Sequence, residues 1–246
     1  MMRLQSTNNT HKEVLEELKN QQSTHYKDSY SSFFKSEKGS YGAHDEFLGV
    51  QTSIVRKIAK KYASLPFCEV DYLMKSQWHE MRFCGLCILI EKYRKASTKK
   101  DEEEMRIIFL YYVDNLECVN NWDLVDISAP YISGEYLLNK DRSILYEWAH
   151  SESLWKQRIA MLSTAAFIKD NDFGDTLRLA EVYLNHPHDL IHKATGWMLR
   201  EVGKRDESIL TEFLNRFASV MPRTMLRYSL EKYSPETRKY FMELKK

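Results

Sequence analysis

The sequence contains few of the residues that interrupt regular structure. Only eight glycines and five prolines occur in 246 residues, where average usage would give about 30. An all-β sandwich or barrel needs a turn about every ten residues, and such turns rely on glycine and proline. The scarcity disfavours those folds and predicts a mostly helical chain.

The sequence also lacks a long hydrophobic run. The longest apolar stretches, residues 83–90 and 159–168, are much shorter than the roughly 20 residues of a membrane-spanning helix. The opening residues MMRLQSTNNT have no apolar segment or cleavage site of a signal peptide. We therefore expect a cytoplasmic protein without a membrane partner. In that reducing compartment Cys68, Cys84, Cys87 and Cys118 would remain thiols.

Neither sign of charge is in excess. Lys and Arg total 36, Asp and Glu total 35, and the formal net charge is +1. This balance argues against a cationic protein that coats DNA and against an acidic disordered tail. It still permits nucleic-acid binding, which needs only one basic face. The hydrophobic fraction of 43% is enough for a sizeable core.

Apolar residues recur at helical spacing along most of the chain. N-terminal stripes of this kind are Val14, Leu15 and Leu18, then Tyr30, Phe33 and Phe34. Helices are predicted over residues 54–62, 70–75, 79–93, 102–116, 124–132, 142–149, 154–168, 176–184, 190–202 and 207–217. Gly203 is predicted to end the helix before it, and Pro222 and Pro235 to begin the last two helices.

Basic residues followed by small residues recur at a period typical of helical repeats. Arg158 and Lys193 lie 35 residues apart in similar patterns, and Arg82 has the same character. Such a period indicates stacked antiparallel helix pairs. We expect an all-α chain, an α-α superhelix or solenoid, as one domain over residues 1–246. A globular bundle is the alternative, and residues 1–10 are expected to be disordered.

The segment around Trp122 carries the clearest chemical signal. If it is helical, Trp122 and Asp126 are one turn apart and share a face. An indole beside a carboxylate could stabilise a cation through the ring face and through Coulomb attraction, and the carboxylate could position a water. The alternative, which the local sequence alone favours, is that Trp122 packs in the core and Asp126 caps a helix.

Other segments combine arginine with tryptophan or with a second arginine. Arg158 could clamp a phosphate through its planar guanidinium. Trp197 and Arg200 are three residues apart, and Arg223 and Arg227 are four apart. A further basic cluster without any acid comprises Arg56, Lys57, Lys60 and Lys61. A solvated helix face is the ordinary alternative for each.

Two patterns that resemble metal or redox sites are set aside. His186, His188 and His192 lack a third and fourth ligand at convincing spacing, so no metal is predicted. Cys84 and Cys87 lie in an apolar helix without the context of a redox pair, so buried thiols are predicted. Phosphate-binding, dinucleotide-binding and serine-hydrolase motifs are absent from the sequence.

Five motifs stand out along the chain. They are Phe47-Leu-Gly-Val-Gln-Thr, the run from Trp122 to Asp126, Trp155-Lys-Gln-Arg158, Lys193-Ala-Thr-Gly-Trp197-Met-Leu-Arg-Glu and Met221-Pro-Arg-Thr-Met-Leu-Arg-Tyr228. Together they resemble the AlkD-like DNA alkylation repair family. They occur in the family's order from about residue 25 to the C-terminus. The resemblance implies a solenoid of HEAT-like repeats that hydrolyses the N-glycosidic bond of N3- or N7-alkylated, cationic purines in duplex DNA, for base excision repair.

The resemblance also implies roles for individual residues. The family's two tryptophans, aspartate and arginine fall on Trp122, Trp197, Asp126 and Arg158, which would form the catalytic site. Candidates for contacts with the DNA backbone are Gln51, Arg56, Lys57, Lys193, Arg200, Lys204, Arg223 and Arg227. No cofactor or metal is implied, and we expect a monomer. Two other hypotheses are a non-catalytic helical-repeat protein that binds damaged or branched DNA, and a protein–protein scaffold.

Overall fold

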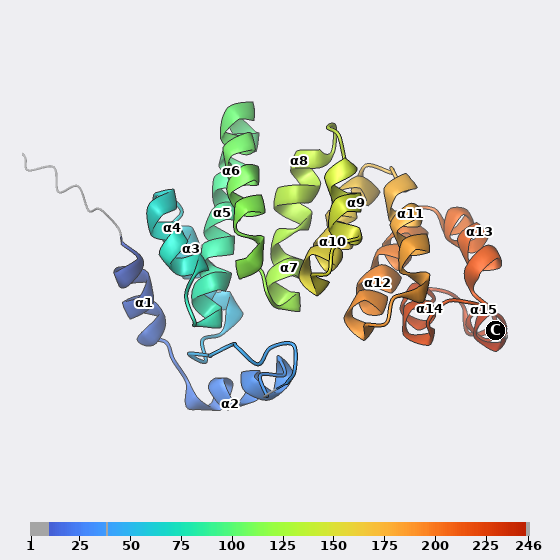
Figure 1. Cartoon of the computed structure of the whole chain (residues 1–246), viewed down its shortest axis with the longest axis horizontal. Coiled ribbons are helices and arrows are strands. Elements are labelled where there is room, and N and C mark those ends of the chain that lie inside the picture. Colours follow the sequence, from blue (N-terminus) through green and yellow to red (C-terminus); the bar gives the residue numbers. More distant parts are fainter. Residues whose placement is uncertain (1–9, 38, 245–246) are drawn as a thin grey trace, which may run out of the picture. The chain divides into compact units, whose positions relative to one another are not determined.

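Helices account for the regular structure of the part of the chain that the computed structural model describes, residues 10–37 and 39–244 (Figure 1). One isolated parallel bridge joins Glu46 to Trp78 there. The predicted all-α fold is confirmed. The helices group into two compact units, Met1–Ser128 and Ala129–Lys246. The expectation of one domain stays a prediction. Disorder was expected for residues 1–10, of which residues 1–9 lie outside the described residues, whereas Thr10 is the N-cap of the first helix.

The N-terminal unit contains seven α-helices and a short 3₁₀ turn within the described residues. They are α1 (His11–Lys19), α2 (Thr24–Phe33), α3 (Thr52–Lys61), α4 (Phe67–Met74), α5 (His79–Lys99), α6 (Glu102–Asp114), the turn Leu116–Cys118 and α7 (Trp122–Ser128). Helix α5 is the centre of the unit, because α3, α4, α6 and α7 all pack against it. Its residues from His79 to Ile90 are all buried.

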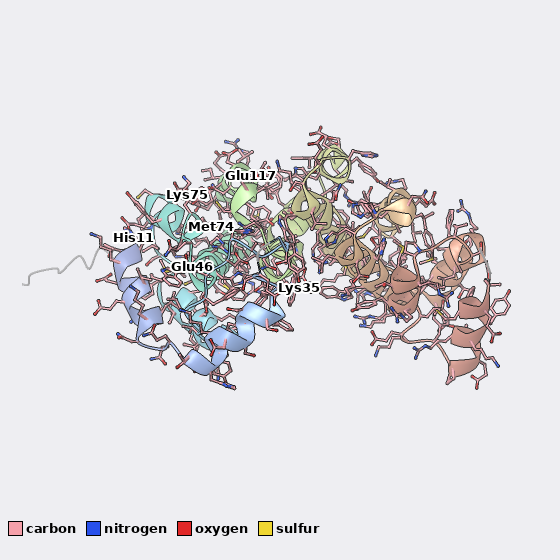
Figure 2. All side chains as sticks on the ribbon, turned by 60° about the horizontal axis from the view of Figure 1, so that its bottom comes forward. His11, Lys35, Glu46, Met74, Lys75 and Glu117 are labelled. Atoms are coloured by element: carbon pink, nitrogen blue, oxygen red, sulfur yellow. The ribbon has the colours of Figure 1, made fainter. Side chains whose placement is uncertain are left out.

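The amphipathic pattern of the N-terminal helices explains their packing. Val14 and Leu18 of α1 are fully buried, as the first predicted stripe requires. Met74 at the end of α4 is fully buried, whereas Lys75, the next residue, is exposed (Figure 2). The second predicted stripe is only partly correct. Phe34 is buried, but Phe33 is 62% exposed.

The C-terminal unit repeats pairs of helices. Its elements in the described residues are the π-helical turn Pro130–Gly134, α8 (Glu135–Leu137), α9 (Ser143–Ala149), α10 (Leu154–Lys169), α11 (Gly174–Val182), the 3₁₀ turn Tyr183–Asn185, α12 (Asp189–Arg205), α13 (Glu207–Phe217), α14 (Arg223–Ser229) and α15 (Pro235–Glu243). Helix α10 packs against α12, and α12 packs against α14. Arg158 and Lys193 are both the fifth residue of their helices, so their spacing of 35 reflects a structural repeat.

Helix α12 continues past the glycine that was predicted to end it. Gly203 lies inside the helix, which ends at Arg205. The chain becomes extended at Asp206, whose carboxylate accepts the amides of Ser208 and Ile209 and so caps α13. A Cβ on residue 203 would lie 2.4 Å from Leu210 Cδ2. Gly203 therefore allows α13 to pack closely rather than stopping α12.

Most other helix boundaries agree with the periodicity. The predicted helix over residues 207–217 matches α13, and Pro235 begins α15 as expected. Pro222 precedes the first residue of α14 instead of occupying its first turn. The segment predicted as one helix over residues 124–132 divides into α7 and the π-helical turn Pro130–Gly134. The turn includes a proline, which cannot donate the backbone hydrogen bond that a continuous α-helix needs.

Gly196 provides a test of the close contact between α12 and α14. A Cβ at this position would lie 2.5 Å from the carbonyl oxygen of Met225 and 2.6 Å from Tyr228 Cβ. We expect Gly196→Ala to lower the free energy of unfolding by about 1–3 kcal/mol, measured by urea denaturation, because both neighbours belong to a packed helix. The control is Gly174→Ala at the start of α11, where the nearest atom is 3.7 Å away. Equal stability of the two variants would contradict the close contact.

Candidate functional site

The tryptophan and the aspartate of the clearest motif lie on one short helix. Trp122 begins α7 and Asp126 follows one turn later, so the predicted shared face is present. Both side chains are half-buried. Asp126 lies inside α7, so it does not act as a helix cap. Its carboxylate is therefore placed one turn from an indole, as the chemistry described above requires.

Two aromatic rings at the C-terminal end of α2 pack against Trp122. Phe34 stacks on its indole at a centroid distance of 5.3 Å and an angle of 28°. Phe33 meets the same indole edge-on at 5.4 Å and 71°. The exposure of Phe33 places a second aromatic ring beside Trp122 at the surface. Trp122 is therefore part of a partly open aromatic cluster, and the prediction that Phe33 faces the core is wrong.

A buried group of charges connects α7 to α5. His79, the first residue of α5, is 3% exposed. Its Nε2 lies 2.8 Å from an oxygen of Asp123 and its Nδ1 lies 3.3 Å from an oxygen of Asp45. Arg82 forms an ion pair with Asp45, and Asn121 donates a hydrogen bond to it. The residues just before and just after Trp122 are thus both bound to this group.

The charges of this group shift one another's titration. Burial disfavours the charged imidazole of His79, but the negative charge of Asp123 and hydrogen bonds to Asp123 and Asp45 outweigh it. Together they raise the pKa of His79 to about 9. Burial alone would raise the pKa of Asp45, yet the hydrogen bond from His79 and the charge of Arg82 hold that pKa below its ordinary value. His79 is therefore a cation at neutral pH.

Glu80, next to His79, binds the backbone of the motif that begins at Phe47 and contains Gly49. Its carboxylate accepts the amides of Leu48, Gly49 and Val50 at 3.0, 2.7 and 3.1 Å. Gly49 has a φ of +81°, and a Cβ there would lie 2.2 Å from the carbonyl oxygen of Ser23. Only glycine fits both the conformation and the contact. The glycine of this motif thus allows the start of α2 to lie against the segment bound by Glu80.

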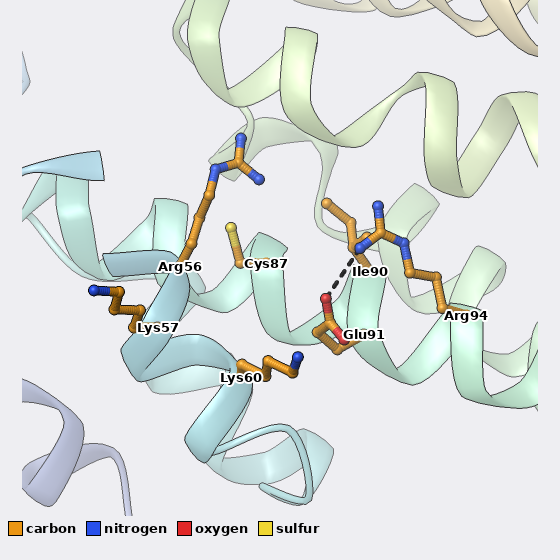
Figure 3. Close-up of a pocket in the computed structure, with 7 residues that line it drawn as sticks. All are labelled: Arg56, Lys57, Lys60, Cys87, Ile90, Glu91 and Arg94. Carbon is orange, nitrogen blue, oxygen red and sulfur yellow. Dashed lines mark hydrogen bonds and ion pairs between the residues drawn. The ribbon is translucent and has the colours of Figure 1, made fainter. Parts of the chain in front are cut away.

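A basic pocket lies between α3 and α5. It has a volume of about 270 Å³. Its lining residues are Arg56, Lys57 and Lys60 of α3 and Cys87, Ile90, Glu91 and Arg94 of α5 (Figure 3). Arg94 donates to Glu91 at 3.0 Å, and the Arg56 guanidinium lies 5.3 Å from the centre of the Phe83 ring. Four cations surround one carboxylate here, which is suited to binding an anion.

Arg158 of the C-terminal unit is more buried than a free phosphate clamp would be. It is 4% exposed, and its Nη1 donates to the carbonyl of Leu190. This bond connects α10 to the first turn of α12, the helix that carries Trp197. Whether Arg158 contacts a phosphate stays a prediction.

Glu201 organises three of the predicted residues on α12. Its carboxylate accepts the indole N–H of Trp197 at 3.1 Å and the ammonium of Lys204 at 2.8 Å. It also lies 3.4 Å from Arg200, which forms a second ion pair with Glu231. Trp197 is half-buried. The charges of Arg200 and Lys204 are therefore partly compensated, and Glu201 sets the orientation of the Trp197 ring.

The remaining candidates for DNA contacts lie at the ends or exposed faces of helices. Gln51 precedes α3 and donates to the hydroxyl of Tyr26. Lys193 forms an ion pair with Asp189 one turn before it, at 2.8 Å. Arg223 and Arg227 are exposed on α14. The structure thus presents Arg223 and Arg227 to solvent, and it gives Gln51 and Lys193 partners within the protein.

The histidines near α12 form hydrogen bonds within the protein, and the two cysteines of α5 are buried. His186 bonds to Gln157 at 2.9 Å, and His192 bonds to the carbonyl of His186. Within the described residues no cluster of three or more His, Cys, Asp or Glu side chains could hold a metal ion. Cys84 and Cys87 are buried as predicted, and burial raises the pKa of both thiols, that of Cys87 to about 12.

Comparison with known proteins identifies the family. A family model described as DNA alkylation repair enzyme matches residues 14–233. The chain belongs to this family. The match spans most of the chain and includes all five motifs, so the resemblance is confirmed. No curated protein matches the chain in sequence.

A solved structure shares the fold. A predicted DNA alkylation repair enzyme from Enterococcus faecalis superposes with a TM-score of 0.67. The two sequences are 15% identical, and the matched region covers 87% of this chain and 98% of the other. At this identity the similarity establishes the all-helical fold. In the described part of the chain, no helix combines the length and the apolar character needed to cross a membrane.

Several residues that shape the candidate site were not predicted as such. His79, Glu80 and Asp45 are charged side chains in segments without a recognisable motif, and Glu201 directly follows Arg200. One signal was available in the sequence. His79, Glu80 and Arg82 precede the apolar run of residues 83–90 within a predicted helix, where polar side chains must be paired to be buried.

The raised pKa of His79 predicts how stability depends on pH. The folded state keeps this proton up to about pH 9, whereas an unfolded histidine loses it near pH 6.5. The stabilisation is complete below pH 6.5 and is lost as the pH rises to about 9. We expect the free energy of unfolding to fall by roughly 3 kcal/mol over that range, measured by urea denaturation. Asp123→Asn should flatten the decrease, and an unchanged slope in that variant would contradict the assignment.

Proposed function

We propose that the protein is a monofunctional DNA glycosylase that hydrolyses the N-glycosidic bond of N3- or N7-alkylated purines in duplex DNA. The observation that carries the proposal is the half-buried pair of Trp122 and Asp126, one turn apart on α7, in a chain of the DNA alkylation repair family. We further propose that it acts as a monomer in the cytoplasm without a cofactor.

The proposed chemistry exploits the charge of the damaged base. An alkylated purine already carries a positive charge, so it leaves without protonation by a general acid. As the bond between C1′ and the base nitrogen breaks, its electron pair goes to the base and positive charge develops on the deoxyribose. The carboxylate of Asp126 stabilises that charge and orients the water that adds to C1′. The water's proton passes to solvent, leaving an abasic site.

The other predicted residues bind the nucleotide. The π faces of Trp122 and Trp197 attract both the cationic base and the cationic sugar. Glu201 holds the Trp197 indole through its N–H at 3.1 Å. Arg158 contacts the phosphate next to the lesion through its planar guanidinium.

The basic pocket between α3 and α5 binds the DNA backbone in this proposal. The cations Arg56, Lys57, Lys60 and Arg94 outnumber the single carboxylate of Glu91. Phosphate contacts of this kind set affinity and salt dependence and carry no base sequence information. Gln51, Lys193, Arg200, Lys204, Arg223 and Arg227 are proposed as further backbone contacts.

Replacement of Asp126 tests the chemistry. We expect the purified chain to release 7-methylguanine from methylated duplex DNA, and Asp126→Asn to lower the single-turnover rate at least about 100-fold, because the amide cannot stabilise the developing cation. Chromatography of the freed base measures the rate. Affinity for the same duplex should change little.

The control is Asp114→Asn, the same chemical change on an exposed residue at the end of α6. It should leave release unchanged. Undiminished release by Asp126→Asn would refute the mechanism. If the wild type binds DNA and releases no base, the function is the non-catalytic binding of damaged or branched DNA. Absence of any preference for DNA would indicate a protein–protein scaffold.

The basic pocket predicts a specific salt dependence. We expect Lys60→Ala to weaken duplex binding and to reduce the slope of log affinity against log salt concentration by about 1, the value for one lost phosphate contact. Fluorescence anisotropy with an undamaged duplex measures both quantities. The matched control, Lys99→Ala, removes an exposed lysine of α5 that does not line the pocket. Equal slopes for both variants would exclude the pocket from the DNA interface.

A further inference from the structure

The two ring nitrogens of His79 face two carboxylates from distant parts of the sequence. Nε2 lies 2.8 Å from Asp123, 44 residues away, and Nδ1 lies 3.3 Å from Asp45, 34 residues away. An ionised carboxylate only accepts hydrogen bonds, so the ring satisfies both partners when each nitrogen carries a proton. The geometry therefore favours the imidazolium form.

We propose that His79 is a positioning residue whose imidazolium ties the first turn of α7 to a rigid buried frame, and so sets the placement of Trp122 and Asp126. The proposal rests on the function proposed above. It assigns no contact between His79 and the substrate.

The frame is fixed independently of α7. The guanidinium of Arg82 donates to the carbonyls of Ser76 and Gln77 at 2.7 and 3.1 Å and also pairs with Asp45. Asp45 is fully buried within this arrangement. A carboxylate held in this way gives His79 a stationary partner on one side. The other partner, Asp123, belongs to the helix that carries Trp122 and Asp126.

Two routes connect His79 to Trp122. The first is the bond from His79 to Asp123, which directly follows Trp122 in the chain. The second passes through aromatic rings, because His79 lies 4.9 Å from the Phe34 ring and Phe34 stacks on Trp122. An aromatic face attracts a cation. Loss of the positive charge on His79 would therefore weaken both the hold on α7 and the packing beneath the indole.

The opposite end of α7 is held separately. The hydroxyl groups of Tyr112 and Ser128 lie 2.9 Å apart, and both side chains are fully buried. Asn121 adds a bond at the start of the helix, since its side-chain oxygen accepts the amide of Trp122 at 2.8 Å. A change of charge on His79 therefore acts on the first turn of α7, where Asn121 also links the Trp122 amide to Asp45, and it leaves the contact at the far end of the helix in place.

The charges around His79 determine what deprotonation would do. The buried cluster contains two carboxylates, Asp45 and Asp123, and two cations, His79 and Arg82. Neutral His79 would leave one uncompensated negative charge, which is costly in a buried site. Other titratable groups facing the cluster are Glu80, whose carboxylate is bound by three amides, His44 beside Asp45, and Tyr30 of α2.

Three measurements on the full chain test the proposal. NMR titration of the His79 imidazole gives its protonation directly. A ¹⁹F signal from fluorinated tryptophan, assigned with Trp122→Phe, gives the environment of Trp122. The single-turnover rate of 7-methylguanine release between pH 6 and 10, with duplex affinity at each pH, reports on function.

In the wild type we expect the His79 titration, the Trp122 signal and the fall in release rate to share a midpoint near pH 9. In Asp123→Asn the midpoint should fall by at least one pH unit for all three. The release rate at pH 7.5 should fall about tenfold while affinity changes less than twofold. The matched control, Asp114→Asn, should leave every midpoint unchanged.

A neutral His79 at pH 7 in the wild type would overturn the proposal, and so would a Trp122 signal that does not follow the titration. If the wild type releases no base, the proposed function fails, but the NMR and ¹⁹F measurements still decide whether His79 positions α7. His79→Gln is a second variant. If it does not fold, Asp123→Asn decides the question alone.

Discussion

The placement of Trp122 and Asp126 depends on charges buried at the first turn of α5. Glu80 binds three amides of the segment containing Gly49, and His79 pairs with Asp123 at the start of α7. Arg82 joins the same cluster through Asp45. Buried ions are costly unless every partner is present, so removal of one partner destabilises the others. These paired charges hold the segments around Asp45 and Gly49 against α5, together with the helix that carries Trp122 and Asp126.

The C-terminal unit relies on close helix packing instead. Gly196 lets α14 approach the backbone of α12, and Gly203 lets α13 approach it further along. Polar contacts lie on the remaining face of α12, where Glu201 binds the indole of Trp197 and pairs with Lys204. One helix thus combines a tightly packed face with a face that carries a predicted catalytic residue. Both glycines lie within the helix because a side chain would collide with its neighbours.

Sequence periodicity predicted most helices, because the burial of one helix face requires apolar residues at regular spacing. The errors occurred where distant residues decide the outcome. Gly203 does not end α12, because the chain turns only at Asp206, which caps α13. Phe33 is exposed, because its ring meets Trp122 at the surface and does not enter the core. The four predicted catalytic residues came from motif order and residue type, which carry no information about burial, so the buried state of Arg158 was not foreseen.

The sequence by itself determined that the chain is helical, which residues share a helix face, and that its motifs belong to a DNA alkylation repair family. These properties depend on local spacing and on motif order. The tertiary structure alone decided which charges are buried together. Asp45 meets Asn121 across 76 residues, and His79 meets Asp123 across 44. Such pairs form because folding removes these groups from water, where each then needs the other as its partner. The spacing of neighbouring residues in the sequence does not predict which distant groups will pair.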